Sequence, residues 1–333
     1  MTSNLTRRLF LKRASQACGI LVFLPAAKSI GKIGLSNKEG YYEHSIVAMG
    51  TTARLGVYAK SEAAANEVIT SAFNELKRLE SLFTIFDERS EISQLNAIAG
   101  VGHTKISSDT LSILRSAIEY TRLTNGAFDI TVEPLMRLWG FRKDSNELQA
   151  LPTSEEIASG LQFVGSEQIE LDAIHSTARL RSSGAKLDLG GIAVGYSLDK
   201  MVNILKPEGI ENAFLDISGD IYALGAPHGH PGWNVAIPDP QDTSKLIYKT
   251  HISNEALATS GNYMSYVVYN AMRYGHIMDP HEGRSAHSVL SSTVIAKTGI
   301  DVDALSTASF VKGEKYGDTK LMLVNRHGSI DVS

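Results

Sequence analysis

The residues best suited to chemistry in this 333-residue chain lie in two short segments that are far apart in the sequence. Residues 186–199 have the pattern of a strand that ends on Asp188, a glycine-rich turn and then a helix. Residues 301–307 place Asp303 and Thr307 four residues apart, and so on one face of a helix. A carboxylate, a hydroxyl and main-chain carbonyls are oxygen ligands that Mg²⁺ takes alongside substrate phosphates. The two segments therefore indicate phosphate chemistry on a nucleotide-like ligand.

Each of these residues also has an ordinary structural interpretation. Gly190 and Gly191 suit a tight turn that lets the next helix pack, and their spacing fits neither a dinucleotide-binding loop nor a P-loop. Asp303 could cap the start of the last helix. His276 could be a turn histidine that bonds to the backbone. Asp188 is the hardest to explain in this way, because a carboxylate at the buried end of a strand needs a partner.

The charge balance limits the class of partner. The formal net charge is −4, and the first 28 residues hold five basic residues and no acidic ones, so −4 minus five leaves −9 for the remainder. An acidic chain without a run of lysine or arginine argues against nucleic acid as a partner.

The N-terminus has the pattern of an export signal. Arg7 and Arg8 precede an apolar run over residues 17–27, about half of the ~20 residues that span a bilayer. We therefore expect a twin-arginine signal over residues 1–28 and a periplasmic or extracytoplasmic location at the inner membrane, with membrane contact only through the signal if it stays uncleaved. The alternative is a basic amphipathic helix. The single cysteine, Cys18, lies inside this segment, so the rest of the chain has neither thiol nor disulfide.

Hydrophobic periodicity predicts the elements that position these residues. Helices are expected over 63–82, from an N-cap at Asp109 to a stop at 125–126, from Ser154, and over 193–205 and 302–311. Strands are expected as a pair within 46–59, and over 169–172, 178–181, 185–189, 214–217, 221–224, 235–238, 247–252, 266–269, 289–296 and 320–324. Few strict strand–helix–strand repeats favour the α+β class over a doubly wound sheet, as one large sheet-and-helix domain or two tightly joined lobes.

A series of motifs, each weak alone, follows in a fixed order along most of the chain after the signal. They are Met49-Gly50-Thr51-Thr52, Ser90 to Asn96, Gly126 to Leu135 with Trp139-Gly140-Phe141, Asp188 to Asp199, Ser218-Gly219-Asp220-Ile221, Thr259-Ser260-Gly261, His276 to Pro280 and Asp303 to Thr307. Together they resemble the ApbE family, the FAD:protein FMN transferases. The resemblance predicts that residues 29–333 form one flavin transferase domain.

The resemblance implies Mg²⁺-dependent transfer of FMN from FAD to a threonine or serine of an acceptor flavoprotein, with a new phosphoester and release of AMP. The FAD contacts that it implies are Met49, Phe86, Ala127, Phe128, Asp129, Asp188, Val194 and Ile277. It implies Mg²⁺ ligands at Asp303, Thr307 and the main-chain oxygen of Gly191. His276 is the candidate base for the acceptor hydroxyl, because the free pKa of histidine lies near neutrality.

The chain departs from the family pattern at several points. Val194 replaces a polar residue, Phe86 replaces a tyrosine, Gly275 replaces a histidine, and Glu282-Gly283 replaces Thr-Gly. These changes leave other functions open: an FAD pyrophosphatase that releases FMN and AMP, a flavin-binding protein without turnover, or an unrelated α+β scaffold that binds no flavin. Cleavage of FAD that requires Mg²⁺ separates the enzymes from the carrier.

Overall fold

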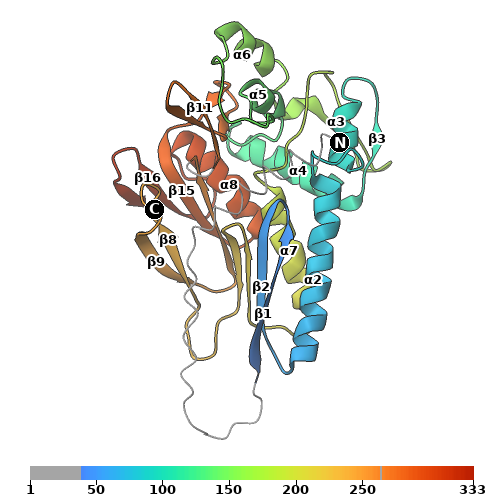
Figure 1. Cartoon of the computed structure of the whole chain (residues 1–333). Coiled ribbons are helices and arrows are strands. Elements are labelled where there is room, and N and C mark those ends of the chain that lie inside the picture. Colours follow the sequence, from blue (N-terminus) through green and yellow to red (C-terminus); the bar gives the residue numbers. More distant parts are fainter. Residues whose placement is uncertain (1–38, 263–264) are drawn as a thin grey trace, which may run out of the picture.

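The computed structural model describes residues 39–262 and 265–333 (Figure 1). The expected signal over residues 1–28, with Cys18, lies outside the described residues. The helices are α2 (Glu62–Phe83), α3 (Glu91–Ala97), α4 (Ser108–Leu123), α5 (Glu133–Leu138), α6 (Ser154–Leu161), the 3-10 turn η1 (Ser166–Gln168), α7 (Ala193–Leu205) and α8 (Gly299–Lys312). Within the described ranges, no helix combines the length and the apolar character that crossing a membrane requires.

An eight-stranded sheet forms the centre of the molecule, and neighbouring strands run antiparallel throughout. In spatial order its strands are β1 (Gly40–Ala48), β2 (Thr51–Ala59), β6 (Ala213–Ile217), β7 (Asp220–Leu224), β10 (Glu255–Gly261), β15 (Val289–Ala296), β16 (Lys320–Asn325) and β17 (Ile330–Val332). The smaller sheets are formed by β3 (Thr104–Lys105), β4 (Ile169–Asp172) and β5 (Thr177–Leu180), by β8 (Trp233–Pro238) with β9 (Leu246–Ile252), by β11 (Tyr266–Tyr269) with β12 (Met272–Gly275), and by β13 (Met278–Asp279) with β14 (Arg284–Ser285).

Strand register brings several of the motifs to one end of this sheet. Met49 and Gly50 both have positive φ and form the two-residue β1–β2 turn, as a tight hairpin requires. Ser218 and Gly219 form the β6–β7 turn in the same way. Because Ala53 pairs with Ile217, the two turns lie side by side. The antiparallel β10 brings its C-terminal residues to the same end.

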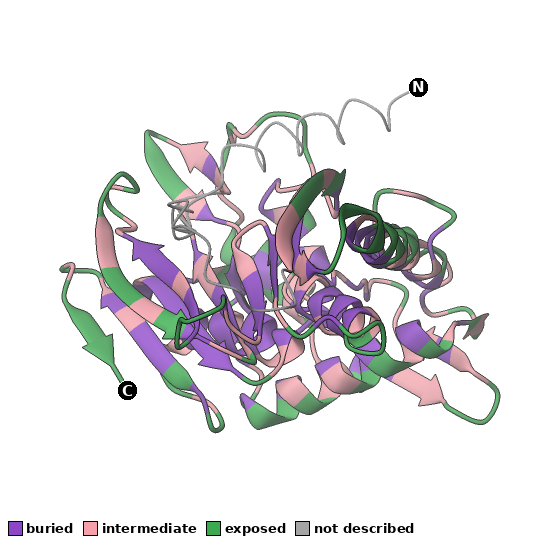
Figure 2. Cartoon of the chain, turned by 90° about the horizontal axis from the view of Figure 1, so that it is seen from below, coloured by how far each residue is buried: buried purple, intermediate pink, exposed green. Residues whose placement is uncertain are grey.

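One face of the sheet is covered by α2, α7 and α8. Ser61 caps α2, and the apolar residues of that helix, among them Val68, Ala72 and Leu76, are buried against the strands. Figure 1 shows α2 beside the β1–β2 ribbon, and Figure 2 shows the buried residues concentrated in the central strands and helices. The β8–β9 hairpin covers the other face with Trp233, which is 1% exposed. The sheet therefore has a packed core on both faces.

The shorter helices α3 to α6 gather beyond one end of α2, at the top of Figure 1. The apolar residues of α3 and α4 form a second core that continues into α7 and α8, and Met49 and Tyr120 pack against both cores. Those of α5 and α6 form a separate small cluster around Trp139. Trp139, just after α5, donates to the Gly283 carbonyl at 2.9 Å and so ties α5 to the segment that follows β13. The protein is thus a single α+β domain with a helical cap, as the element pattern predicts.

Several expected elements need correction. Asp109 does not cap the second helix: the Ser107 side chain accepts from Thr110 N, and Asp109 lies inside the first turn, where it pairs with Arg78 at 2.5 Å. Residues 185–189 belong to no strand. The short helices α3 and α5 and the strand β10 were not predicted. Helices of seven and six residues are too short to show periodicity.

Two glycines allow α7 and α8 to approach closely. A Cβ added at Gly195 would lie 2.1 Å from the Gly299 carbonyl oxygen and 2.7 Å from Asp303 Cβ. A Cβ added at Gly299 would lie 2.4 Å from the Gly195 oxygen. Backbone cannot yield as a flexible side chain can, so these positions require glycine. Gly195 therefore allows the close helix packing that was expected of the glycine-rich segment.

Gly195→Ala should separate the two helices and destabilise the protein by about 1–3 kcal/mol, the usual cost of overpacking. Denaturant unfolding measures this loss. Gly102→Ala is the control, because a Cβ at Gly102 meets nothing within 4 Å. Equal stability of the two variants would contradict the packing argument.

Candidate functional site

Asp303 lies in the interior of α8 rather than at its start. Thr298 caps that helix and accepts from Asp301 N, so the interpretation of Asp303 as the cap is wrong. Asp303 is 6% exposed, and its Oδ2 accepts from Gly195 N at 2.9 Å. The close crossing of α7 and α8 therefore buries a carboxylate against the first turn of α7.

The glycine-rich turn and α8 also meet at Gly191 and Thr307. A Cβ at Gly191 would lie 3.2 Å from Thr307 Oγ1 and 3.4 Å from the Phe128 ring. Ser260, from the β10 motif, has its Oγ 3.4 Å from Thr307 Oγ1. The structure thus brings Gly191, Thr307 and Phe128 together from three separate motifs. Asp303 lies one turn earlier on α8. Ser260, from a fourth motif, contacts Thr307.

Burial makes this region favourable for a cation. Burial raises the pKa of Asp303 to about 7. Burial also raises the pKa of Asp220, and the carboxylates of Asp303 and Asp216 raise it further. Arg54 pairs with Asp216 at 2.5 Å, and it is the one ion-pair partner found for Asp216 among the described residues. Negative charge with little compensation in a buried place favours binding of a cation.

The donor set fits a hard cation. A carboxylate, a hydroxyl and a main-chain oxygen are all oxygen ligands, and a side chain at Gly191 would fill the space beside Thr307. In the part of the chain that the structure describes, no three histidine, cysteine, aspartate or glutamate side chains are placed to hold one metal ion. A cation here would accordingly depend on hydroxyl, main-chain and ligand oxygens as well as on Asp303.

Asp188 lies on a segment that a side chain holds in place. The Asn96 amide accepts from Leu187 N at 2.7 Å and donates to Leu187 O at 2.9 Å, while Asp188 N donates to Ile130 O at 2.8 Å. These bonds replace the strand partner that the sequence suggested, which is why residues 185–189 form no strand. The carboxylate of Asp188 accepts from Gly190 N at 2.8 Å.

Arg142 is the partner that Asp188 needs, and sequence reasoning missed it. Its guanidinium forms an ion pair with Asp188, and its Nε donates to Glu133 Oε2 at 2.8 Å. The Arg142 Cζ lies 5.9 Å from the centre of the Phe86 ring, whose residue is 38% exposed. The one local signal was an arginine, followed directly by Lys143, after the apolar segment at Trp139. It is weak because Asp188 lies far away in the sequence.

His276 has a defined tautomer. Its Nδ1 lies 3.2 Å from the Ser265 carbonyl oxygen. A carbonyl only accepts, so Nδ1 carries the hydrogen and Nε2 of the neutral ring keeps a lone pair. Burial lowers the pKa of His276, the Ser265 bond and Asp188 raise it, and Arg142 lowers it. His276 can therefore be both a turn histidine that bonds to the backbone and a candidate base, because the backbone bond selects the tautomer that a base needs.

The remaining residues that were predicted to contact FAD differ in their burial. Met49 is half-buried in the β1–β2 turn, and Val194 is half-buried in the first turn of α7. Ala127 is fully buried. Ile277 follows His276, is 8% exposed, and donates its N–H to Asn262 Oδ1 at 3.3 Å. These positions are compatible with a ligand site but do not by themselves define one.

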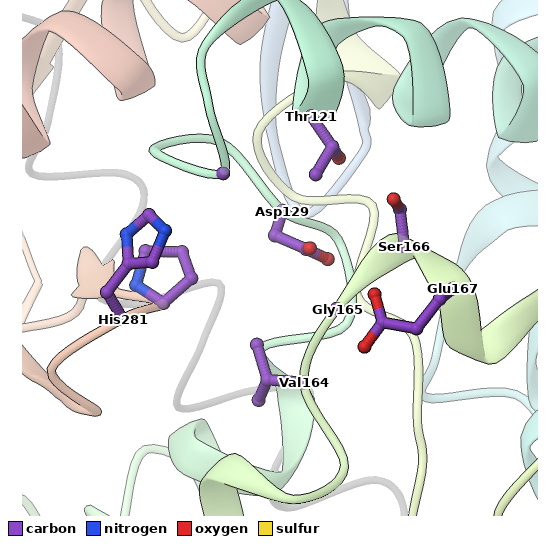
Figure 3. Close-up of a pocket in the computed structure, with 9 residues that line it drawn as sticks. Thr121, Asp129, Val164, Gly165, Ser166, Glu167 and His281 are labelled. Atoms are coloured by element: carbon purple, nitrogen blue, oxygen red, sulfur yellow. The ribbon is translucent and has the colours of Figure 1, made fainter.

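Asp129 faces a separate cavity of about 200 Å³. Figure 3 shows its carboxylate between His281 on one side and Ser166 and Glu167 on the other. Thr131 N donates to Asp129 Oδ1 at 2.8 Å, and burial raises the pKa of Asp129. None of the other predicted site residues lines this cavity.

Known proteins resemble the chain in sequence and in structure. The model of the ApbE family matches residues 49–331. The FAD:protein FMN transferase of Vibrio cholerae is 30% identical over 272 residues, 81% of this chain and 80% of the relative, and that of Treponema pallidum is 30% identical over 89% of this chain and 84% of the relative. The crystal structure of the ApbE protein from Thermotoga maritima has a TM-score of 0.81 and 33% identity, and covers 88% of this chain and 97% of that one. The flavin transferase ApbE from Vibrio cholerae has a TM-score of 0.76 and 26% identity over 89% and 98%.

Asn96→Ala should leave Leu187 N and O without partners and destabilise the protein by roughly 2–4 kcal/mol, since each unsatisfied buried group costs about 1–3 kcal/mol. Denaturant unfolding measures the loss. Gln94→Ala on the same helix is the control, because Gln94 makes an exposed bond to the Arg89 carbonyl. A loss no larger than that of the control would show that the amide does not hold the segment.

Proposed function

The chain belongs to the ApbE family, and from that premise we propose that it is an enzyme that transfers FMN from FAD to a threonine or serine hydroxyl of an acceptor flavoprotein, with Mg²⁺ as cofactor. The observation that carries the proposal is the meeting of Gly191 and Thr307 beside Phe128. These residues come from three motifs that the resemblance assigns to one site, and they adjoin a buried carboxylate.

Asp303, Thr307 and the main-chain oxygen of Gly191 would hold Mg²⁺. When bound, the cation neutralises charge on the diphosphate oxygens of FAD. The protein's own part is to position: in phosphoryl transfer, alignment and electrostatics supply most of the rate. Burial of Asp303 strengthens its interaction with a cation, because the surrounding dielectric is low.

His276 is the proposed base. Its Nε2 takes the proton of the acceptor hydroxyl, whose oxygen forms a bond with the FMN-side phosphorus. The bond from that phosphorus to the bridging oxygen breaks, and AMP leaves with that oxygen. Asp188 is the proposed polar contact to FAD. Phe86 is a further proposed contact, and the guanidinium of Arg142, which pairs with Asp188, lies over its ring. The products are an FMN phosphoester on the acceptor and free AMP.

The location follows from the N-terminal pattern alone. Residues 1–28 have the order of a twin-arginine signal, and we propose that residues 29–333 act outside the cytoplasm, in the periplasm or at the outer side of the inner membrane. The acceptor would then be an FMN-carrying protein in the same compartment.

The direct test incubates the purified protein with FAD and a peptide that carries one threonine, with and without Mg²⁺. FMN on the peptide by mass spectrometry, only with Mg²⁺ and not on the matching Thr→Val peptide, is the expected result. Free FMN and AMP with every acceptor would instead indicate a pyrophosphatase. Intact bound FAD would indicate a carrier.

His276→Ala should slow transfer by about 10²–10⁴-fold, the usual contribution of a general base, and leave FAD affinity nearly unchanged. Transfer rates and FAD titration measure the two effects separately. Exposed His287→Ala is the control. Full activity of His276→Ala would refute the assignment of the base.

The stability of Asp303→Asn tests the proposed cation site by a measurement that does not depend on catalysis. Mg²⁺ at about 100 times its dissociation constant should raise the free energy of unfolding of the native protein by about 2.7 kcal/mol, but not that of the variant. In EDTA at pH 8 the variant should be at least as stable as the native protein. Burial raises the pKa of Asp303 from 3.8 to about 7, so the native carboxylate carries its full cost at pH 8, and this cost decreases as the pH falls from 7 toward 3.8.

Denaturant unfolding at pH 6 and pH 8 measures both effects. The control is Asp318→Asn, which changes an exposed carboxylate in the loop after α8. Equal stabilisation of both variants by Mg²⁺ would place the cation elsewhere.

A further inference from the structure

The helices α7 and α8 carry the same short pattern where they cross. Gly195 and Asp199 lie four residues apart on α7, and Gly299 and Asp303 lie four residues apart on α8. Residues at this spacing lie on one face of a helix, so each helix presents a glycine and, one turn later, an aspartate on the same side. The glycines let the two backbones meet, because a Cβ on either would lie within 2.4 Å of the carbonyl oxygen of the other.

Each aspartate accepts hydrogen bonds from the backbone of the other helix. From α8, Asp303 Oδ2 accepts from Gly195 N at 2.9 Å. From α7, Asp199 Oδ1 accepts from Gly299 N at 2.7 Å, and its Oδ2 accepts from Ile300 N at 2.9 Å. The two carboxylates thus join the first turn of each helix to the other helix.

Neither helix start is complete without the other helix. The first N–H groups of a helix have no acceptor within it and need one from outside. The residue before α7 is Ile192, whose side chain offers no acceptor, and the Asp303 carboxylate supplies one instead. In α8 the Thr298 side chain accepts from Asp301 N, and Asp199 accepts from the two N–H groups before it. Because Asp199 binds two successive N–H groups, it fixes both the position and the rotation of that turn.

The proposed ligands of Mg²⁺ lie on the segments that this contact aligns. Asp303 and Thr307 follow Gly299 by one and two turns of α8, and Gly191 lies just before α7. A site of this kind must be held to within about 0.5 Å, so a shift at the start of α8 would disturb it. The bond from α7 to Asp303 cannot prevent such a shift alone, because a bound cation draws on the same carboxylate. The bonds of Asp199 do not depend on the cation.

We propose that Asp199 is a positioning residue for the cation site: by holding the first turn of α8 against α7, it keeps Asp303 and Thr307 in register with the main-chain oxygen of Gly191. The inference deepens the proposed function and rests on it. It gives a role to the last residue of the motif at 188–199, to which the family resemblance assigned none. Asp199 is half-buried and both of its carboxylate oxygens are bound by α8, so it acts through that helix rather than as a ligand.

Two simpler roles for Asp199 make different predictions. A cap that only stabilises the protein predicts a lower free energy of unfolding with an unchanged Mg²⁺ affinity. Thr298→Ala is the control for this role, because Thr298 caps the same helix from its own chain segment. A charge that only attracts the cation predicts an equal effect of a neighbouring carboxylate. Asp301→Asn is the control for that role, because Asp301 lies in the same turn of α8 but bonds to Tyr120 of α4.

The test measures the affinity of the full-length protein for Mg²⁺ without FAD. The free energy of unfolding, followed at increasing Mg²⁺ concentration, gives the dissociation constant. At pH 8 both carboxylates are charged, since burial raises the pKa of Asp199 to about 6 and that of Asp303 to about 7. Asp199→Asn keeps the shape of the side chain but turns an NH₂ group toward a backbone N–H. It should raise the dissociation constant by about 10–100-fold, the usual effect of changing a group that orients a metal ligand.

The controls should behave differently. Thr298→Ala should lower stability and leave the Mg²⁺ affinity close to that of the native protein, and Asp301→Asn should weaken binding less than Asp199→Asn does. An unmoved dissociation constant in folded Asp199→Asn, or an equal rise in either control, would overturn the inference.

Asp199→Glu is a second variant that does not require Asp199→Asn to fold. It keeps the charge and both oxygens but lengthens the side chain by one methylene, and so displaces the start of α8. Mg²⁺ binding should weaken although the charge is unchanged. Native affinity in this variant would also overturn the inference.

The Mg²⁺ dependence of FMN transfer connects the binding measurement to the reaction. In Asp199→Asn the Mg²⁺ concentration for half-maximal transfer should rise by the same factor as the dissociation constant, while the rate at saturating Mg²⁺ should stay near that of the native protein. Failure of Mg²⁺ to stabilise the native protein would refute the proposed cation site, and this inference with it. Equal Mg²⁺ affinity of the native protein and folded Asp199→Asn would refute this inference alone.

Discussion

The close crossing of α7 and α8 is the constraint on which the rest of the site depends. Gly195 and Gly299 let the two backbones meet at distances that no side chain would allow. The same approach places Asp303 against Gly195 N and Thr307 beside Gly191. A hydroxyl and a main-chain oxygen are thereby gathered beside a buried carboxylate, and burial strengthens its interaction with a cation and raises the cost of leaving it unpaired.

The α7 and α8 helices pack against the large antiparallel sheet where they cross. Its hairpin turns at Met49 and Ser218 need positive φ at both turn residues, and register sets them side by side at the end of the sheet where the helices meet. The helical cap closes the other side, tied by Trp139 to the segment after β13. The motifs that lie far apart in the sequence are thus mostly turns and helix ends, which explains why they are short.

Charge divides the region into two parts with different tasks. Around Asp303, carboxylates outnumber cations, as the proposed Mg²⁺ site requires. Around Asp188, Arg142 balances the charge, and His276 keeps a tautomer fixed by the Ser265 carbonyl. The Asp129 side chain lines a cavity together with Glu167 and His281.

The sequence by itself determined the α+β class, the limits of α7 and of most strands, and the family, because periodicity, turns and motifs are encoded within a few neighbouring residues. It failed where the deciding partner is distant. Residues 185–189 form no strand because the Asn96 side chain, from another helix, takes the place of a neighbouring strand. Ser107 rather than Asp109 caps α4, since Asp109 pairs with Arg78. The burial of Asp303, the pairing of Arg142 and the direction of Asp129 were decided only by tertiary structure, because each depends on which side chains the fold brings into contact.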